Sequence, residues 1–123
     1  MLETAKIAAF VSTRDRATAR TFYGQTLGLQ LVHEDDYAVV FDSNGVSLRV
    51  SVVKDLVPQK FTVLGWNVSD IEATAKAMIA KGIAFERVPG LEQDTLGIWT
   101  PAPGVKVAWF KDPDGNWLSI AQH

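Results

Sequence analysis

The sequence has 123 residues, which suits one domain that buries roughly two-thirds of the surface its unfolded chain would expose. Hydrophobic residues make up 47% of it and the formal net charge is -2, so we expect a soluble globular protein, with no electrostatic reason to expect a nucleic-acid partner. With 0 cysteines and 2 histidines, disulfides, thiolate ligands, a cysteine nucleophile and a histidine-rich metal site within one chain are excluded.

No stretch of the chain has the apolar length of a membrane span. The first six residues, Met1 to Lys6, also lack the apolar core of a signal peptide. We therefore expect a cytoplasmic protein with no membrane partner.

The first half of the chain predicts strands and one helix. Asp15 is the expected N-cap, and apolar residues then recur near helical spacing until Gly28 ends the pattern. The turn Asp42-Ser43-Asn44-Gly45 lies between two alternating apolar runs, which is a strong hairpin signal. The strands that we expect here are 6–12, 29–33, 37–41 and 46–53, followed by a linker over 54–60.

After the linker the same order of elements begins again. A strand is expected over 61–68, and Ser69-Asp70-Ile71-Glu72 reads as a capping box that opens a helix closed by Gly82. Another strand is expected over 83–88, then a looser region through Gly104. Residues 6–15 align with residues 61–70 at an offset of about 55, which indicates two βαβββ modules.

The chain ends in a hairpin whose register can be predicted. A Pro113-Asp114-Gly115 loop, formed as a type I turn with a glycine bulge, sets Trp109 opposite Ser119. The core face is then Ala108, Phe110, Leu118 and Ile120, and the opposite face carries Trp109, Trp117 and Ser119.

Three features carry a family resemblance: the two modules, the string Phe22-Tyr23 to Leu27-Gly28-Leu29, and the hairpin Asp112-Pro113-Asp114-Gly115-Asn116. In these features the chain resembles the vicinal oxygen chelate superfamily, which includes glyoxalase I, bleomycin-resistance proteins and extradiol dioxygenases. The resemblance implies an α+β fold in which two βαβββ sheets curl around a cleft, often in a homodimer. It implies one glyoxalase-like domain over 1–123, with module one at 1–55, the linker at 54–60 and module two at 61–123. It says little about chemistry, because one fold hosts many activities.

Enzymes of this superfamily hold a divalent metal at four places, and counting from the caps and turns puts those places at Ala8, Arg49, Val63 and Ser119. Methyl and isopropyl groups cannot coordinate, a guanidinium has no lone pair to donate, and one serine hydroxyl is a poor ligand. Shifting the register by one residue brings in only apolar neighbours and Thr62. We therefore expect no metal site and no cofactor.

Alternation places the side chains that would line the cleft. Phe10, Ser12, Ser47 and Ser51 share the face of Ala8 and Arg49; Asn67, Trp109, Trp117 and, near the rim, Lys111 share the face of Val63 and Ser119. By analogy between the two turns, Tyr37, Val39 and Phe41 join the Arg49 side, although a two-residue Asn44-Gly45 loop would reverse this. The residues expected to bind a ligand are Phe10, Phe41, Arg49, Ser51, Val63, Trp109, Trp117 and Ser119.

Each of these residues also has an ordinary structural interpretation. Ser47, Arg49 and Ser51 could be the solvated side of a half-buried strand. Trp109 and Trp117 could fill a core or a dimer interface as readily as they could stack on a ligand. His33 beside Glu34 and Asp35 could suggest acid-base chemistry, or be a surface histidine at a strand end.

Three functions remain open from the sequence. The favoured one is a metal-free binding protein of the bleomycin-resistance type, which holds a small aromatic or anionic compound, in a homodimer. The second is a glyoxalase-like lyase or isomerase, or a dioxygenase-related enzyme, with a non-standard site. The third is a dimeric structural or regulatory module whose cleft is vestigial.

Overall fold

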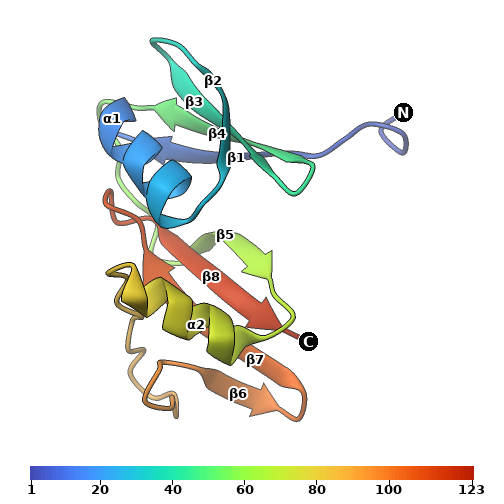
Figure 1. Cartoon of the computed structure of the whole chain (residues 1–123), viewed down its shortest axis with the longest axis vertical. Helices are drawn as coiled ribbons and strands as arrows, with labels where there is room; N and C mark the ends of the chain where they lie inside the picture. Colours follow the sequence, from blue (N-terminus) through green and yellow to red (C-terminus); the bar gives the residue numbers. More distant parts are fainter. The chain divides into compact units, whose positions relative to one another are not determined.

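A computed structural model describes all residues, 1–123, and the chain divides into two compact units, Met1–Val57 and Pro58–His123. Each unit is a four-stranded mixed sheet with helical structure on one face (Figure 1). The expected α+β fold is confirmed. The boundary between the units falls inside the segment expected to be a linker.

The first unit has strand order β1-β4-β3-β2, with β1 parallel to β4 and the other neighbours antiparallel. A short α-helix continues directly into a π-helical segment between β1 and β2. The elements are β1 (Ala8–Thr13), α1 (Arg16–Ala19), η1 (Arg20–Thr26), β2 (Gln30–Glu34), β3 (Ala38–Ser43) and β4 (Val46–Val52).

The expected N-cap opens the first helix. Asp15 has an extended backbone, and its side chain accepts a hydrogen bond from the Thr18 N–H at 3.3 Å. Farther along, the Leu27 N–H donates to the Phe22 carbonyl at 2.9 Å, five residues back, which is the π-helical pattern. The helix therefore begins as the sequence predicts and then widens.

The core of the first unit lies between this helix and one face of the sheet. Tyr23 and Phe41 are buried, with ring centroids 6.1 Å apart, and Leu48 and Val50 are buried beside them. A Cβ at position 24 would come within 3.3 Å of the Phe41 ring, so Gly24 allows the helix to approach the sheet closely. The opposite face of this sheet carries no helix of its own unit.

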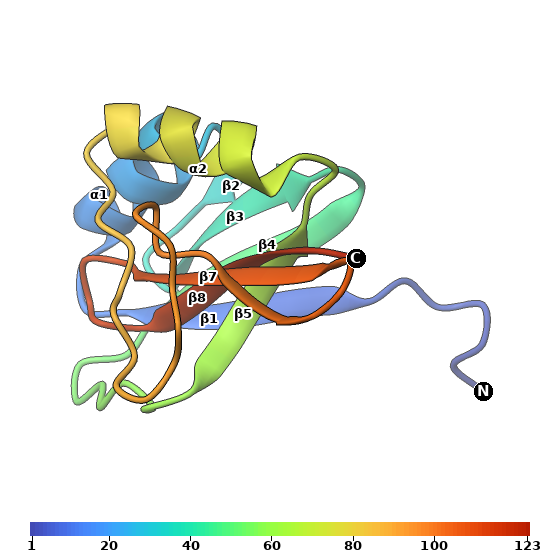
Figure 2. The same cartoon turned by 90° about the horizontal axis from the view of Figure 1, so that it is seen from below.

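The second unit repeats the topology with strand order β5-β8-β7-β6. Here β5 is parallel to β8, and the other neighbours are antiparallel. In Figure 2 the helix α2 lies over one face of the sheet. The elements are β5 (Thr62–Asn67), α2 (Ile71–Ala80), β6 (Trp99–Ala102), β7 (Val105–Lys111) and β8 (Trp117–Gln122).

Both ends of α2 are hydrogen-bonded. The N-cap is Asp70, which accepts from the Ala73 N–H at 3.1 Å, so the capping box expected to begin at Ser69 is wrong by one residue. At the other end the Ile83 N–H donates to the Met78 carbonyl at 3.1 Å, and Gly82 has φ 94. This is a Schellman ending, and Gly82 closes the helix as expected.

The strand expected over 83–88 is wrong, and the edge position next to β7 is taken by β6 instead. One backbone bond joins this segment to the sheet, from the Glu86 N–H to the Trp109 carbonyl at 2.8 Å. The Gln93 side chain takes other backbone groups: it accepts from the Val88 N–H at 2.7 Å and donates to the Glu86 carbonyl at 2.8 Å. A side chain thus occupies bonds that a neighbouring strand would have made.

The core of the second unit centres on Phe110. The Trp66 ring stacks on it with centroids 6.4 Å apart, and the Phe85 ring meets it edge-on with centroids 5.9 Å apart. Ile71 and Ala75 of α2 are buried as well. Offset-stacked and edge-on aromatic pairs of this kind add to the stability that burial alone provides.

The terminal hairpin has the predicted register. Trp109 lies opposite Ser119 and Phe110 opposite Leu118. The buried Asp112 carboxylate organises the turn by accepting from the Asn116 N–H at 2.9 Å and from its side-chain amide at 2.7 Å. The turn chemistry therefore fixes which side chains face the core.

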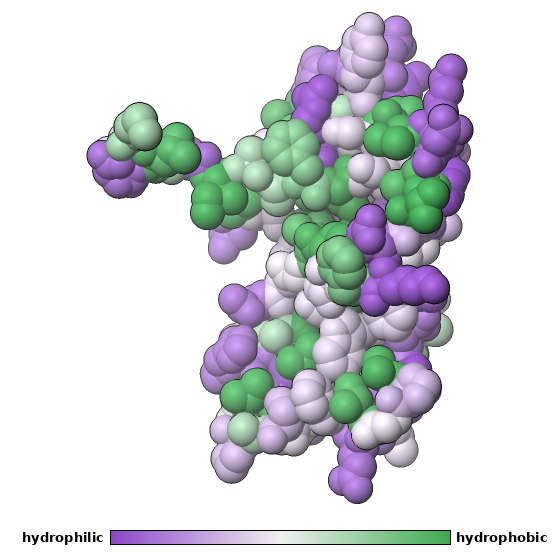
Figure 3. All heavy atoms as spheres, turned by 180° about the vertical axis from the view of Figure 1, so that it is seen from behind, coloured by the Kyte–Doolittle hydropathy of each residue, from purple (hydrophilic) through white to green (hydrophobic).

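Neither helix reaches the length and hydrophobicity needed to cross a bilayer. Before β1 the chain extends as an exposed segment in which hydrophobic and hydrophilic residues are mixed (Figure 3). Its Leu2 and Ile7 side chains are about four-fifths exposed, at 79% and 80%.

Candidate functional site

The face of the first sheet that carries no helix is called the open face of the first sheet. Residues directly opposite one another in paired strands share a face, so the register defines its rows. The central row runs across all strands as Phe10, Arg49, Val40 and His33. The flanking rows are Ser12, Ser51 and Ala38 on one side and Ala8, Ser47, Asp42 and Gln30 on the other.

Arg49 sits at the centre of this open face. It is half-buried, with Phe10 beside it on β1 and Val40 beside it on β3. Its guanidinium forms no hydrogen bond or ion pair within the first unit. Asp42 lies one row along on the same face, and its carboxylate accepts from the Gly45 N–H at 3.4 Å. The first sheet therefore presents a cation between apolar neighbours.

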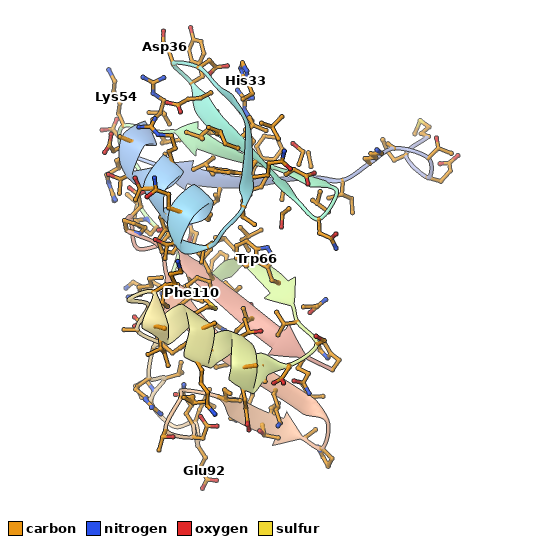
Figure 4. The ribbon with its side chains drawn as sticks, in the orientation of Figure 1. His33, Asp36, Lys54, Trp66, Glu92 and Phe110 are labelled. Atoms are coloured by element: carbon orange, nitrogen blue, oxygen red, sulfur yellow. The ribbon has the colours of Figure 1, made fainter.

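The same row ends at His33, whose Nε2 lies 2.9 Å from Oδ2 of Asp35. The other oxygen of Asp35 accepts from the Tyr37 N–H at 2.8 Å and the Ala38 N–H at 3.0 Å. The Tyr37 N–H bond, followed by the His33 bond, holds the pKa of Asp35 below its ordinary value. In Figure 4, His33 and Asp36 lie at the β2–β3 hairpin, at the far end of the unit's sheet from the N-terminal strand.

The expected position of Phe41 on the Arg49 face is wrong. Phe41 pairs with Leu48, and Val40 is the residue opposite Arg49. The reason is the loop: Asn44 (φ 48) and Gly45 (φ 87) form a two-residue turn between Ser43 and Val46, one residue shorter than the turn of the second unit. One residue fewer exchanges the two faces of β3. Val39 moves to the core face with Phe41, which is fully buried there.

The second sheet also has a face away from its helix, here called the open face of the second sheet. Ser119 and Trp109 occupy its middle row together with Gly65, not Val63. Val63 is the extra residue of a β-bulge between Thr62 and Leu64. The two neighbouring rows are Thr62, Trp117 and Lys111, and Asn67, Ala121, Val107 and Trp99.

Aromatic rings dominate this second open face. Trp99 and Trp109 lie with ring centroids 5.8 Å apart at an interplanar angle of 31°. The Lys111 ammonium lies 4.9 Å from the centre of the Trp117 ring and 3.3 Å from Oε1 of Glu86. One side of Trp117 is thus covered by a cation that is itself paired with a carboxylate.

Of the eight residues expected to bind a ligand, Phe10, Arg49 and Ser51 share the first open face and Trp109, Trp117 and Ser119 share the second. Three further residues at these faces were not expected from the sequence: Val40, Gly65 and Glu86. The two-residue length of the Asn44-Gly45 turn would have identified Val40. No sequence signal marks Glu86, because a segment outside the strand ladder delivers it.

The four positions where the family resemblance implies metal ligands do not fit a metal. Ala8, Arg49, Val63 and Ser119 offer one hydroxyl oxygen among them, and neither a carboxylate nor an imidazole. The structure also contains no group of three or more His, Asp or Glu side chains placed to hold an ion. No chemical step is therefore assigned to a metal.

A family model described as Glyoxalase/Bleomycin resistance protein/Dioxygenase superfamily matches residues 6–120. A search of curated proteins by sequence gives no significant match. Among solved structures, a glyoxalase family protein from Bacillus anthracis has TM-score 0.73 and 18% identity over 98% of each chain.

Two further solved structures share the fold. A glyoxalase/bleomycin resistance protein/dioxygenase from Alicyclobacillus acidocaldarius has TM-score 0.70 and 18% identity, covering 96% of this chain and 90% of that one. Lactoylglutathione lyase from Agrobacterium tumefaciens has TM-score 0.71 and 15% identity, covering 98% of this chain and 95% of that one. The family resemblance and the fold of two βαβββ modules are confirmed; at these identities the structural likeness concerns the fold alone.

Proposed function

Since this chain belongs to the Glyoxalase/Bleomycin resistance protein/Dioxygenase superfamily, we propose that it is a small-molecule-binding protein that holds an organic anion without a metal ion. The observation that carries the proposal is Arg49, a half-buried guanidinium on an open sheet face with no partner in its own unit. The ligand's carboxylate, sulfonate or phenolate is the partner.

The physical argument starts from the cost of an unpaired charge. A guanidinium partly removed from water loses hydration, and that loss is offset only when hydrogen-bond acceptors replace the water. A planar carboxylate suits it because two parallel N–H bonds form at once. Ser47 and Ser51 lie two residues before and two residues after Arg49 on the same strand face, and their hydroxyl groups are available to other polar atoms of the ligand.

Aromatic side chains favour a ligand with a flat, apolar body. On the first open face, Phe10 lies beside Arg49 and is 62% exposed, which leaves its ring available for contact. On the second open face, Trp109, Trp117 and Ser119 form a separate surface of the same character. Aromatic surface with a few polar groups is the usual composition of a small-molecule site.

The test is a titration of the purified protein with aromatic carboxylates and sulfonates, followed by tryptophan fluorescence and thermal shift. Arg49→Ala should weaken binding by about 1.5–3 kcal/mol, which is roughly 10- to 150-fold in Kd, the range for hydrogen bonds to a charged group. Arg20→Ala is the matched control, because Arg20 pairs with Glu34 away from this face. Equal binding by Arg49→Ala and the parent contradicts the anchoring role, and a panel without any binder contradicts the function.

An enzyme is the second candidate, and the His33–Asp35 hydrogen bond in the same row as Arg49 favours it. A histidine held by a carboxylate can accept a proton from a bound substrate. Incubating the binders with the protein and following them by NMR tests this directly. Turnover that His33→Gln abolishes supports an enzyme, and unchanged compounds support binding alone.

A further inference from the structure

The second unit carries an internal ion pair that lies against an aromatic ring on its open face. Lys111 places its ammonium 4.9 Å from the Trp117 ring centre, and Glu86 places Oε1 3.3 Å from the same ammonium. We propose that this ammonium is an anion-binding position that Glu86 occupies in the free protein. A planar aromatic carboxylate or sulfonate binds the second unit by exchanging with Glu86.

Backbone bonds hold Glu86 in its place. Its N–H donates to the Trp109 carbonyl at 2.8 Å, and its carbonyl accepts from the Gln93 side-chain amide at 2.8 Å. The main chain of Glu86 is therefore fixed beside β7, while its carboxylate ends a side chain with rotatable bonds. Such a carboxylate can leave the ammonium without disturbing the sheet.

Breaking the Lys111–Glu86 pair costs little free energy because the pair is partly solvated. The side chains of Lys111 and Glu86 are 42% and 30% exposed. Ion pairs with this exposure add little to stability, since water screens them and two flexible side chains must be held. An incoming anion competes with a weak internal partner, and a ring attached to that anion adds contacts that Glu86 cannot make.

The neighbouring row gives the aromatic body a place to lie. Beside Trp109, the row continues with only Ser119 and Gly65, so this row itself contributes no long side chain above β8 or β5. A Cβ at position 65 would lie 2.5 Å from the Ser119 hydroxyl oxygen, so that hydroxyl leans over the β5 backbone. A flat ring placed here contacts the Trp109 indole, and its anionic group reaches the next row, where Lys111 lies opposite Trp117.

This inference deepens the proposed function, because both require a bound organic anion, but it concerns other residues. The two can fail separately. If Arg49→Ala loses binding and changes at Lys111 and Glu86 do nothing, the proposed function stands without this inference. If the reverse holds, the anion position of the second unit stands and the anchoring role of Arg49 fails.

The experiment uses anilinonaphthalenesulfonate as the anionic probe and naphthol as its neutral counterpart, each titrated into the full chain. Removing the internal competitor in Glu86→Gln should tighten sulfonate binding about threefold, the size expected for releasing a partly exposed ion pair. Lys111→Gln should weaken it at least about fivefold, and Lys111→Arg should stay within about twofold of the parent. Naphthol binding should respond to none of these changes.

A second ion pair on the same strand supplies the control. Lys106 lies 4.0 Å from Glu72 of α2, on the helix side of β7, so Glu72→Gln changes the net charge by the same amount as Glu86→Gln. Equal tightening by both variants means that long-range charge alone acts, and overturns the inference. Unchanged sulfonate binding in Glu86→Gln or in Lys111→Gln overturns it too, as does the absence of saturable binding in the parent. Each variant's thermal unfolding shows that it is folded.

Discussion

Replacing Gln93 by alanine should destabilise the second unit. The Gln93 side chain accepts from the Val88 N–H at 2.7 Å and donates to the Glu86 and Gly97 carbonyls, both at 2.8 Å. Each such bond is worth about 1 kcal/mol net, and water can replace part of the set because the side chain is half-buried. We expect a loss of about 2 kcal/mol, which for a chain of this length lowers Tm by roughly 6–10 °C.

The assay is thermal unfolding by circular dichroism, with amide hydrogen exchange at Val88 as the local readout. Gln93→Glu keeps the acceptor for the Val88 N–H but sets an oxygen against two carbonyls, so it should cost at least as much as alanine. Gln59→Ala, at an exposed position of the same unit, should leave Tm unchanged. If Gln93→Ala unfolds within about 1 °C of the parent and the Val88 amide exchanges no faster, the reasoning is refuted.

Three other outcomes are expected. The pKa of Asp35 is lowered from 3.8, so the ionised carboxylate stabilises the fold above that pH, and this stabilisation is lost as the pH falls through the lowered pKa. The Tm of the parent should therefore drop more steeply below about pH 4 than the Tm of Asp35→Asn. Parallel curves of Tm against pH would contradict this. Added zinc or nickel should leave Tm unchanged, and metal that survives dialysis would show the ligand argument to be wrong. Sedimentation equilibrium should give a dimer at micromolar concentration, because each four-stranded sheet has two edge strands with unpaired backbone groups within its unit. A monomer at that concentration would count against the dimer.

The hairpin of the second unit could be predicted in register because its turn residues specify the loop length. Pro113, Asp114 and Gly115 each suit one position of a three-residue loop, and from that length the pairing of Trp109 with Ser119 follows. The first turn was compatible with a two-residue or a three-residue loop. The analogy with the second turn selected the three-residue loop, which placed Phe41 on the wrong face of the sheet. The turn residues were sufficient to predict the register where they fitted only one loop length. The comparison between the two modules was not sufficient to predict the register of the first hairpin.

The error at 83–88 has a different cause. The segment is apolar enough to form a strand, but whether it pairs depends on groups far along the chain. The Gln93 side chain and β6 take the bonds and the edge that a strand here would need. The position of Glu86 beside Lys111 follows from the same arrangement, so no pattern within either segment could have revealed that part of the candidate site.

The π-helical segment η1 explains why the two modules differ by one residue in the length of their helices. The first helix runs from its cap at Asp15 to the positive-φ Gly28, thirteen positions later, whereas α2 runs from Asp70 to Gly82, twelve positions later. A π turn accommodates one residue more than an α turn without moving either end of the helix. The widened segment therefore holds the one residue by which the first helix exceeds α2. Deleting one residue from η1 should restore an ordinary helix between the same two ends.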